Sequence, residues 1–162
     1  MQLYYTLVQP YFVYCNIVWA SNYPTRIQNL NILHRKAIRT ISRTHQRYYI
    51  HSADLFRQTG ILTLSQINLM QASEFMYKYA NNLLPQIFPN QFSQTSCVNP
   101  YNARSLGNHR PIFCLTNIRQ FSIRYMGAIT WNSIPISILS MKTFYGFRKK
   151  YRECLTYSNW IS

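Results

Sequence analysis

The sequence has very little negative charge. Only three acidic residues, Asp54, Glu74 and Glu153, stand against 17 lysines and arginines, which gives a formal net charge of +14. Nucleotidyl transferases and nucleases of the two-metal type need several carboxylates that converge on Mg²⁺. Three acids scattered along the chain are a poor source of such ligands. We therefore expect no carboxylate-based catalysis and assign no catalytic residue.

The chain also lacks a long uninterrupted apolar run. Polar side chains and Pro10 interrupt residues 1–20, so this segment does not have the pattern of a membrane span. It has neither the charged front nor the small-residue cleavage site of a secretory signal. The cysteines are spread widely, unlike those of a secreted disulfide scaffold. We expect an intracellular protein, nuclear or cytoplasmic, with reduced thiols.

Clustered metal ligands are scarce as well. Cys97, His109 and Cys114 share one loop-rich region, but no Cys-x-x-Cys spacing is present and a fourth ligand would have to come from afar. No histidine is tied to a cysteine by a recognisable pattern, which disfavours a Cys–His nucleophile pair. The sequence therefore predicts no metal site and no cofactor.

What the chain does contain is apolar, aromatic and basic. Its 162 residues, 48% of them hydrophobic, are enough to bury a substantial core. A strong positive field requires an anionic partner, and the 16% aromatic content offers flat surfaces on which bases can stack. Nucleic acid is the first partner to consider, and an anionic membrane surface is the second.

Apolar residues recur at spacings of three and four, which predicts a mainly α-helical fold with no substantial sheet. Helices are expected near 2–20, 25–43, 65–82 and 143–157, with a short one over 53–59 that Gly60 ends. Residues 85–117 are rich in Pro, Asn, Gln, Ser and Thr and are expected to form an irregular connector.

The same periodicity predicts which side chains form the core. In the first helix, expected to bend near Pro10, these are Leu3, Leu7, Tyr11, Val18 and either Tyr14 or Cys15. In the second they are Ile27, Leu30, Ala37, Ile38, Ile41 and either Leu33 or His34. In the later helices they are Ile67, Met70, Phe75, Met76 and Tyr79, and then Phe144, Phe147, Tyr151 and Leu155.

The second helix is the most basic. Arg35, Lys36, Arg39 and Arg43 crowd its polar side with no acid nearby. Like charges three or four positions apart repel each other by a few tenths of a kcal/mol per pair. An anionic ligand would relieve this repulsion. The alternative is a merely solvated face, although surface charge runs usually mix signs.

Six short strings occur in an order that is typical of one protein family. They are Leu3–Cys15 followed by Trp19, then Leu30–Ile41, Met76–Tyr79, Leu83–Pro85, Tyr101–Arg104 and Gly127–Pro135. Together they resemble the C-terminal end of the reverse transcriptases of non-LTR retrotransposons, the group of jockey-like, CR1-like and L2-like elements. The departures are His34 in place of Gln, Ala103 in place of Thr, Ala128 in place of Pro and Ile134 in place of Leu.

The resemblance implies a thumb and post-thumb separated from the catalytic centre. The fingers, the palm with its Asp-Asp motif and the endonuclease of the family are not part of this sequence. The implied organisation is a helical thumb-like bundle over 1–84, an irregular connector over 85–118 and a small helical C-terminal region over 119–162. The implied partners are a template-primer duplex and the palm and fingers of the parent RNA-directed DNA polymerase.

A thumb holds the duplex by its phosphates, for which arginine and lysine on helices are suited. The expected contacts are Arg35, Lys36, Arg39, Arg43 and Arg47, with a second patch at Lys149, Lys150 and Arg152. For that second patch a solvated face is an equal alternative. Arg104 in the connector can reach a phosphate or an unpaired base, or it can stack on Tyr101.

Three alternatives remain open, one for the role of Trp131 and Asn132 and two for the function of the whole chain. Trp131 and Asn132 look functional, but an indole in the core and an amide that closes a turn before Pro135 explain them without a ligand. The whole chain could instead be a free-standing RNA- or DNA-binding protein, or an interaction protein on a membrane surface, since basic amphipathic helices also bind anionic lipid.

Overall fold

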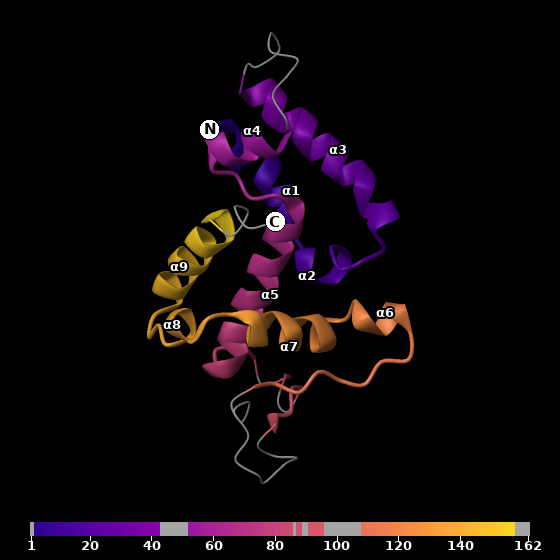
Figure 1. Ribbon diagram of the computed structural model, residues 1–162, viewed down its shortest axis with the longest axis vertical. Coiled ribbons are helices and arrows are strands. Elements are labelled where there is room, and N and C mark those ends of the chain that lie inside the picture. Colours follow the sequence, from indigo (N-terminus) through magenta and orange to yellow (C-terminus); the bar gives the residue numbers. More distant parts are fainter. Residues whose placement is uncertain (1, 43–51, 86, 89–90, 96–107, 158–162) are drawn as a thin grey trace. The chain divides into compact units, whose positions relative to one another are not determined.

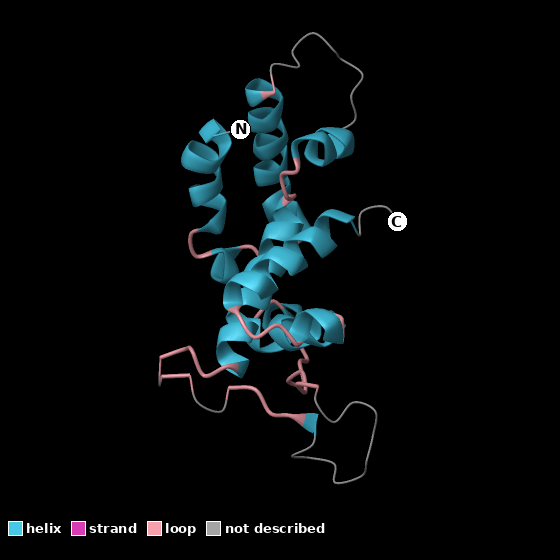
Figure 2. Ribbon diagram, turned by 90° about the vertical axis from the view of Figure 1, so that its left-hand side faces the viewer, coloured by secondary structure: helices cyan, strands magenta, loops and turns pink. Residues whose placement is uncertain are grey.

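The structure, a computed structural model, describes residues 2–42, 52–85, 87–88, 91–95 and 108–157 (Figure 1). Within these ranges the chain consists of helices and loops, and no strand is present beyond an isolated antiparallel bridge between Gln94 and His109 (Figure 2). The predicted mainly α fold is confirmed. The chain forms two compact units: the first unit comprises residues 1–68 and 152–162, and the second unit comprises residues 69–151.

The first unit begins with three short helical pieces in place of the predicted single helix. A π-helix, η1 (Tyr4–Val8), is followed by α1 (Gln9–Val13) and α2 (Asn16–Trp19). Pro10 lies in the first turn of α1, where its missing N–H would have no helical partner in any case. The break comes instead at Cys15, whose φ of 48° places it in the left-handed region. The predicted bend at Pro10 was therefore misplaced.

The core stripe predicted for this segment was also wrong. Its side chains lie on the solvent side, each between 61% and 82% exposed: Leu3, Leu7, Tyr11, Tyr14 and Val18. The buried positions are Tyr4, Phe12, Asn16 and Ala20, and Val8 packs against the core between Tyr4 and Phe12. Both sets have helical spacing, so periodicity alone could not distinguish them. The row with Tyr4 and Phe12 is the one that enters the core, because the rings of both residues pack on His34.

The long helix α3 (Pro24–Ile41) and the short helix α4 (Ser52–Thr59) complete the core of the first unit. Its central cluster consists of Tyr4, Ile38, Leu55, Phe56 and Ile61. His34 is the buried member of the predicted pair, and Leu33 is the exposed one. Gly60 ends α4 as predicted, with a φ of +64° that suits glycine. The amides of Gly60 and Ile61 close the helix end on carbonyls of α4.

The remaining helices are α5 (Leu64–Ala80), α6 (Asn117–Gln120), α7 (Ile123–Ser133), α8 (Ile136–Leu139) and α9 (Phe144–Tyr157). The first residues of α5 and the last of α9 belong to the first unit, and the rest belongs to the second. The compact units therefore place the end of α9 with the N-terminal helices. The three predicted regions, 1–84, 85–118 and 119–162, divide the chain by sequence position and not by compactness. These regions stay a prediction.

Aromatic rings form the core of the second unit. Phe147 of α9 stacks on Tyr77 of α5 with ring centroids 4.6 Å apart, and it also contacts Tyr151 and Trp131. Gly127 of α7 allows the close approach of Met76, whose Sδ lies 3.0 Å from the place where a Cβ would stand. The stripe predicted for residues 143–157 is confirmed, since Phe147, Tyr151 and Leu155 are buried and Phe144 is half-buried.

In the described part of the connector, hydrogen bonds join residues 93–95 to residues 108–110. The Thr95 amide donates to the Asn108 carbonyl at 3.0 Å, and the Arg110 amide donates to the Ser93 carbonyl at 2.8 Å. The Asn132 side chain accepts from the His109 amide at 3.0 Å and donates to the His109 carbonyl at 2.8 Å. Asn132 thus clamps the connector to α7, and the prediction that it closes its own turn was wrong.

Candidate nucleic-acid interface

The predicted basic face lies on α3. Arg35, Lys36 and Arg39 are exposed, while His34 and Ile38 on the other side of the same turns are buried. Arg43 and Arg47 lie outside the described residues. Because residues four apart are neighbours on a helix surface, Arg35 and Arg39 project from adjacent turns of one side. The structure therefore brings together three of the five cations expected here.

The charge of the whole first unit is consistent with this face. Its basic residues are Arg26, Arg35, Lys36, Arg39, Arg43, Arg47, Arg57 and Arg152. Its acids are Asp54 on α4 and Glu153 on α9. Neither acid is on α3, so the helix carries no internal compensation for its cations.

A neutral polar pair lies beneath the basic face. The Tyr4 hydroxyl and Nε2 of His34 are hydrogen-bonded at 2.7 Å, and both residues are fully buried. The rings of Phe12 and Phe56 surround the imidazole at centroid distances of 4.6 and 5.0 Å. Burial lowers the pKa of His34 to about 4, because the apolar surroundings disfavour the charged form. His34 therefore adds no charge to the face and acts as a core residue.

The second predicted patch is divided by the structure. Lys149 and Lys150 are exposed in the second unit. Arg152 belongs to the first unit, where its Nη2 donates to the Tyr5 hydroxyl at 2.9 Å and its guanidinium lies over the Tyr5 ring. The same nitrogen lies 3.5 Å from the Gly60 carbonyl oxygen. Arg152 thus has packing partners within its own unit, whereas the two lysines face solvent. Arg104 lies outside the described residues.

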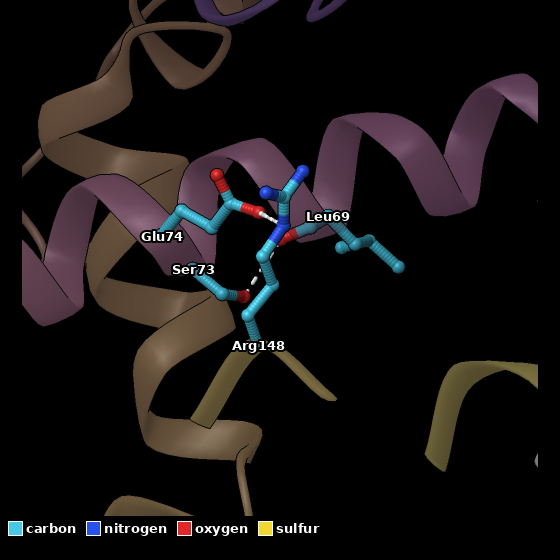
Figure 3. A network of polar contacts seen from close by, with 4 residues as sticks. All are labelled: Leu69, Ser73, Glu74 and Arg148. Atoms are coloured by element: carbon cyan, nitrogen blue, oxygen red, sulfur yellow. Dashed lines mark hydrogen bonds and ion pairs between the residues drawn. The ribbon is translucent and has the colours of Figure 1, made fainter. Parts of the chain in front are cut away.

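Arg148, next to this patch, forms an ion pair with Glu74. Its Nε lies 2.9 Å from Glu74 Oε1, while the neighbouring Ser73 hydroxyl donates to the Leu69 carbonyl (Figure 3). Burial raises the pKa of the Glu74 carboxyl, and the nearby charges of Arg148 and Lys78 oppose that shift. The ion pair compensates the charge of Arg148 locally, whereas Lys149 and Lys150 are exposed, with Glu153 one turn further along α9.

The sequence reasoning missed a further set of cations. Arg110, Arg119 and Arg124 are exposed in the second unit, close in sequence to the exposed ring of Phe113. The sequence does indicate these arginines in one way, because no acidic residue occurs between Glu74 and Glu153. The scattered spacing of these arginines obscured it.

The comparisons with known proteins identify no relative. No protein-family profile, no curated protein and no solved structure matches this chain. Within the described ranges no helix is long and apolar enough to cross a membrane. Those ranges also hold no group of three or more His, Cys, Asp or Glu side chains that could bind a metal ion.

Proposed function

We propose that this chain is a non-catalytic nucleic-acid-binding segment, the thumb and C-terminal end of a non-LTR retrotransposon reverse transcriptase. In this proposal α3 grips the backbone of a template-primer duplex. The observation that carries the proposal is the exposure of Arg35, Lys36 and Arg39 on a helix that has no acid. The ordered blocks of sequence, from Leu3 to Pro135, supply the family.

The chemistry of the face suits phosphates. Arginine and lysine on a helix contact backbone oxygens without reading the bases, which a polymerase needs because it must hold any sequence. Each neutralised phosphate releases condensed counterions, so the affinity depends strongly on salt. No residue of this chain is assigned to catalysis. The polymerase reaction of the parent protein would take place on carboxylates of the palm.

The exposed stripe of the N-terminal segment supports a protein partner as well. Leu3, Leu7, Tyr11, Tyr14 and Val18 present apolar surface to solvent, and monomeric proteins rarely leave large contiguous apolar patches uncovered. We propose that this stripe packs against the palm of the parent polymerase. Burying it would contribute about 25 cal/mol for each Å² of apolar surface removed from water.

The test compares two triple variants that lose the same charge. Changing Arg35, Lys36 and Arg39 to Gln should weaken binding to unrelated duplexes by a similar factor. It should also make the slope of log K against log salt shallower by about 2.7 units. Changing Arg26, Arg57 and Lys142 to Gln is the control and should alter the slope much less. Circular dichroism of both variants should show the helix content of the parent chain.

Each outcome of this comparison is informative. If the α3 variant binds like the parent chain, α3 is a solvated face and the proposal of a duplex grip on it fails. If both variants weaken binding equally, only the net charge matters. If the α3 variant loses affinity for one sequence alone, these residues read bases and the thumb analogy fails at this helix.

The two compact cores favour a second candidate function. Each unit buries aromatic and aliphatic side chains of its own, which is consistent with a free-standing RNA- or DNA-binding protein that works without a palm. Adding a separately produced palm domain would distinguish the two functions. Protection of Tyr11 and Tyr14 from chemical modification is expected for a thumb, and unchanged reactivity is expected for a free-standing protein.

A further inference from the structure

A short exposed segment of the second unit presents apolar side chains inside a basic stretch. Phe113, Leu115 and Ile118 are between 72% and 86% exposed. The cations Arg110 and Arg119 flank them in the sequence, and both are exposed. Exposing three large apolar side chains in a row is costly in water. A ligand that covers them would recover that free energy.

Hydrogen bonds anchor the start of the segment to other parts of the second unit, and local hydrogen bonds form a helical turn at its end. At its start the His109 backbone is clamped by Asn132, and the Arg110 amide donates to the Ser93 carbonyl. At its end the Arg119 amide donates to the Thr116 carbonyl, and the Ser122 hydroxyl donates to the Arg119 carbonyl at 2.7 Å. Because the start is anchored and the end forms a helical turn, the backbone of the segment loses less conformational entropy on binding than an unanchored loop would.

The charge around the segment selects the chemistry of the ligand. Arg110, Arg119 and Arg124 lie within 15 residues, and the nearest acids in the sequence are Glu74 and Glu153. The ligand should therefore be anionic and should also offer flat apolar faces to Phe113. A duplex hides the faces of its bases within the stack, whereas a single strand exposes both its phosphates and its bases.

We propose that this segment is a binding surface for single-stranded nucleic acid. A base stacks on the ring of Phe113, and Arg110, Arg119 and Arg124 contact phosphates on either side. An extended chain spans at most about 3.5 Å per residue, so Arg110 and Phe113 lie within about 10 Å along the backbone. That distance corresponds to roughly three stacked nucleotides of one strand. The surface differs from the basic face of α3 in its unit, its residues and its ligand.

The test measures binding of the full chain to a labelled oligothymidine of about 15 nucleotides by fluorescence anisotropy. A blunt hairpin duplex is the comparison ligand. Phe113→Ala should weaken binding of the single strand by about tenfold, because one stacked base is lost. Its affinity for the duplex should not change. Since Phe113 is exposed, the variant should fold, and circular dichroism verifies that.

Two further variants isolate the aromatic ring. Leu115→Ala removes a similarly exposed aliphatic side chain and should weaken single-strand binding much less than Phe113→Ala, because it offers no ring on which a base can stack. Phe113→Trp should retain or strengthen binding. Changing Arg119 and Arg124 to Gln should make the salt slope for the single strand shallower by about 1.4 units, as expected for two phosphates.

The inference fails if Phe113→Ala binds the single strand like the parent chain, which would leave the apolar segment to a protein partner. It also fails if Leu115→Ala and Phe113→Ala weaken binding equally, since stacking then has no role. The α3 triple variant keeps the two proposals separable. If only the α3 triple variant loses binding, and the ligand it loses is the duplex, the grip on α3 is supported and the single-strand surface is not. If only Phe113→Ala loses binding, and the ligand it loses is the single strand, the single-strand surface is supported and the grip on α3 is not.

Discussion

The two units of the chain use their aromatic residues differently. In the second unit Tyr77, Phe147 and Trp131 pack ring against ring and are buried. In the first unit Tyr11 and Tyr14 face solvent, while Tyr4 enters the core with its hydroxyl hydrogen-bonded to His34. The second unit thus buries its ring cluster and exposes apolar side chains on the segment from Phe113 to Ile118, whereas the first unit keeps a polar pair inside and exposes an apolar stripe along its N-terminal helices. An arrangement of this kind suits a surface that meets a partner.

Both units bury polar groups, and in each the Nδ1 atom of a buried histidine, His34 or His109, has no hydrogen-bond partner within the described residues. His34 makes its hydrogen bond through a side chain. The backbone of His109 is held by both groups of the Asn132 amide. Glu74 is paired with Arg148. The polar pair in the core of the first unit therefore rests on one hydrogen bond, which protonation of His34 can disturb.

The largest expected effect is on the aromatic core of the second unit. Phe147→Ala removes a fully buried ring that contacts Tyr77, Tyr151 and Trp131, and it should cost about 3–5 kcal/mol of unfolding free energy. Urea denaturation followed by tryptophan fluorescence measures it. Tyr145→Ala, on the exposed side of α9, is the control and should stay within about 0.5 kcal/mol. Equal losses of unfolding free energy in the two variants would show that the ring cluster around Phe147 does not stabilise the second unit.

Acid should act mainly on the first unit. The unfolded pKa of histidine is near 6.5 and the folded value for His34 is about 4, so the unfolded chain binds more protons between these values. Stability should be complete above pH 6.5 and should fall as the pH drops towards 4, by on the order of 3 kcal/mol. Thermal unfolding across this range measures the loss.

His34→Gln is the control for the acid experiment. Burial also lowers the pKa of His109, which contributes in the same direction, so the parent chain alone cannot separate the two histidines. The glutamine variant should lose stability less steeply between pH 6.5 and 4 than the parent chain. An identical pH profile in both chains would show that His34 is not the group that titrates.

A smaller effect is expected from the hydroxyl of Tyr4. Tyr4→Phe keeps the ring in the core but removes the hydrogen bond to Nε2 of His34, which leaves a buried polar atom unpaired. The cost should be about 1–2 kcal/mol. Tyr5→Phe, which removes the hydroxyl that accepts from Arg152 at a more exposed position, should cost less. The reverse order would place the critical contact of this unit at Arg152.

The smallest effect should come from the exposed stripe. Changing Leu7 and Tyr11 to Gln should alter the unfolding free energy of the isolated chain by no more than about 0.5 kcal/mol, because both side chains already face water. Phe12→Ala, in the buried row beside them, should be clearly destabilising. A large loss from the Leu7 and Tyr11 variant would show that the stripe is covered within the chain itself.

Much of the helical architecture could be predicted from local patterns. The starts of α3 and α5 lie within one residue of the expected positions, and Pro24 marks the first of them. The buried stripe of α9 was also predicted. The N-terminal segment could not be, because its two apolar rows have the same period. The left-handed turn at Cys15 has no glycine or proline that would reveal it.

The candidate interface was predictable in part for the same physical reason. Exposure of Arg35, Lys36 and Arg39 follows from their places outside the apolar row of α3 that contains Ile38. The ion pair between Arg148 and Glu74 joins residues 74 positions apart, and the contact of Arg152 with Tyr5 joins residues 147 apart. No local pattern contains such pairs. Lys149, Lys150 and Arg152 therefore look alike in the sequence and differ in the structure.

By itself, the sequence determined the charge of the chain, its helical character and the residues that each helix could bury, because these depend on composition and on spacing along one element. Only the tertiary structure decided which apolar row of the N-terminal segment enters the core, whether His34 or Leu33 is buried, and which arginines are engaged. Those choices depend on the neighbours that distant segments provide. Tyr4 is buried because its hydroxyl forms a hydrogen bond with His34 and its ring belongs to the same apolar cluster as Phe56.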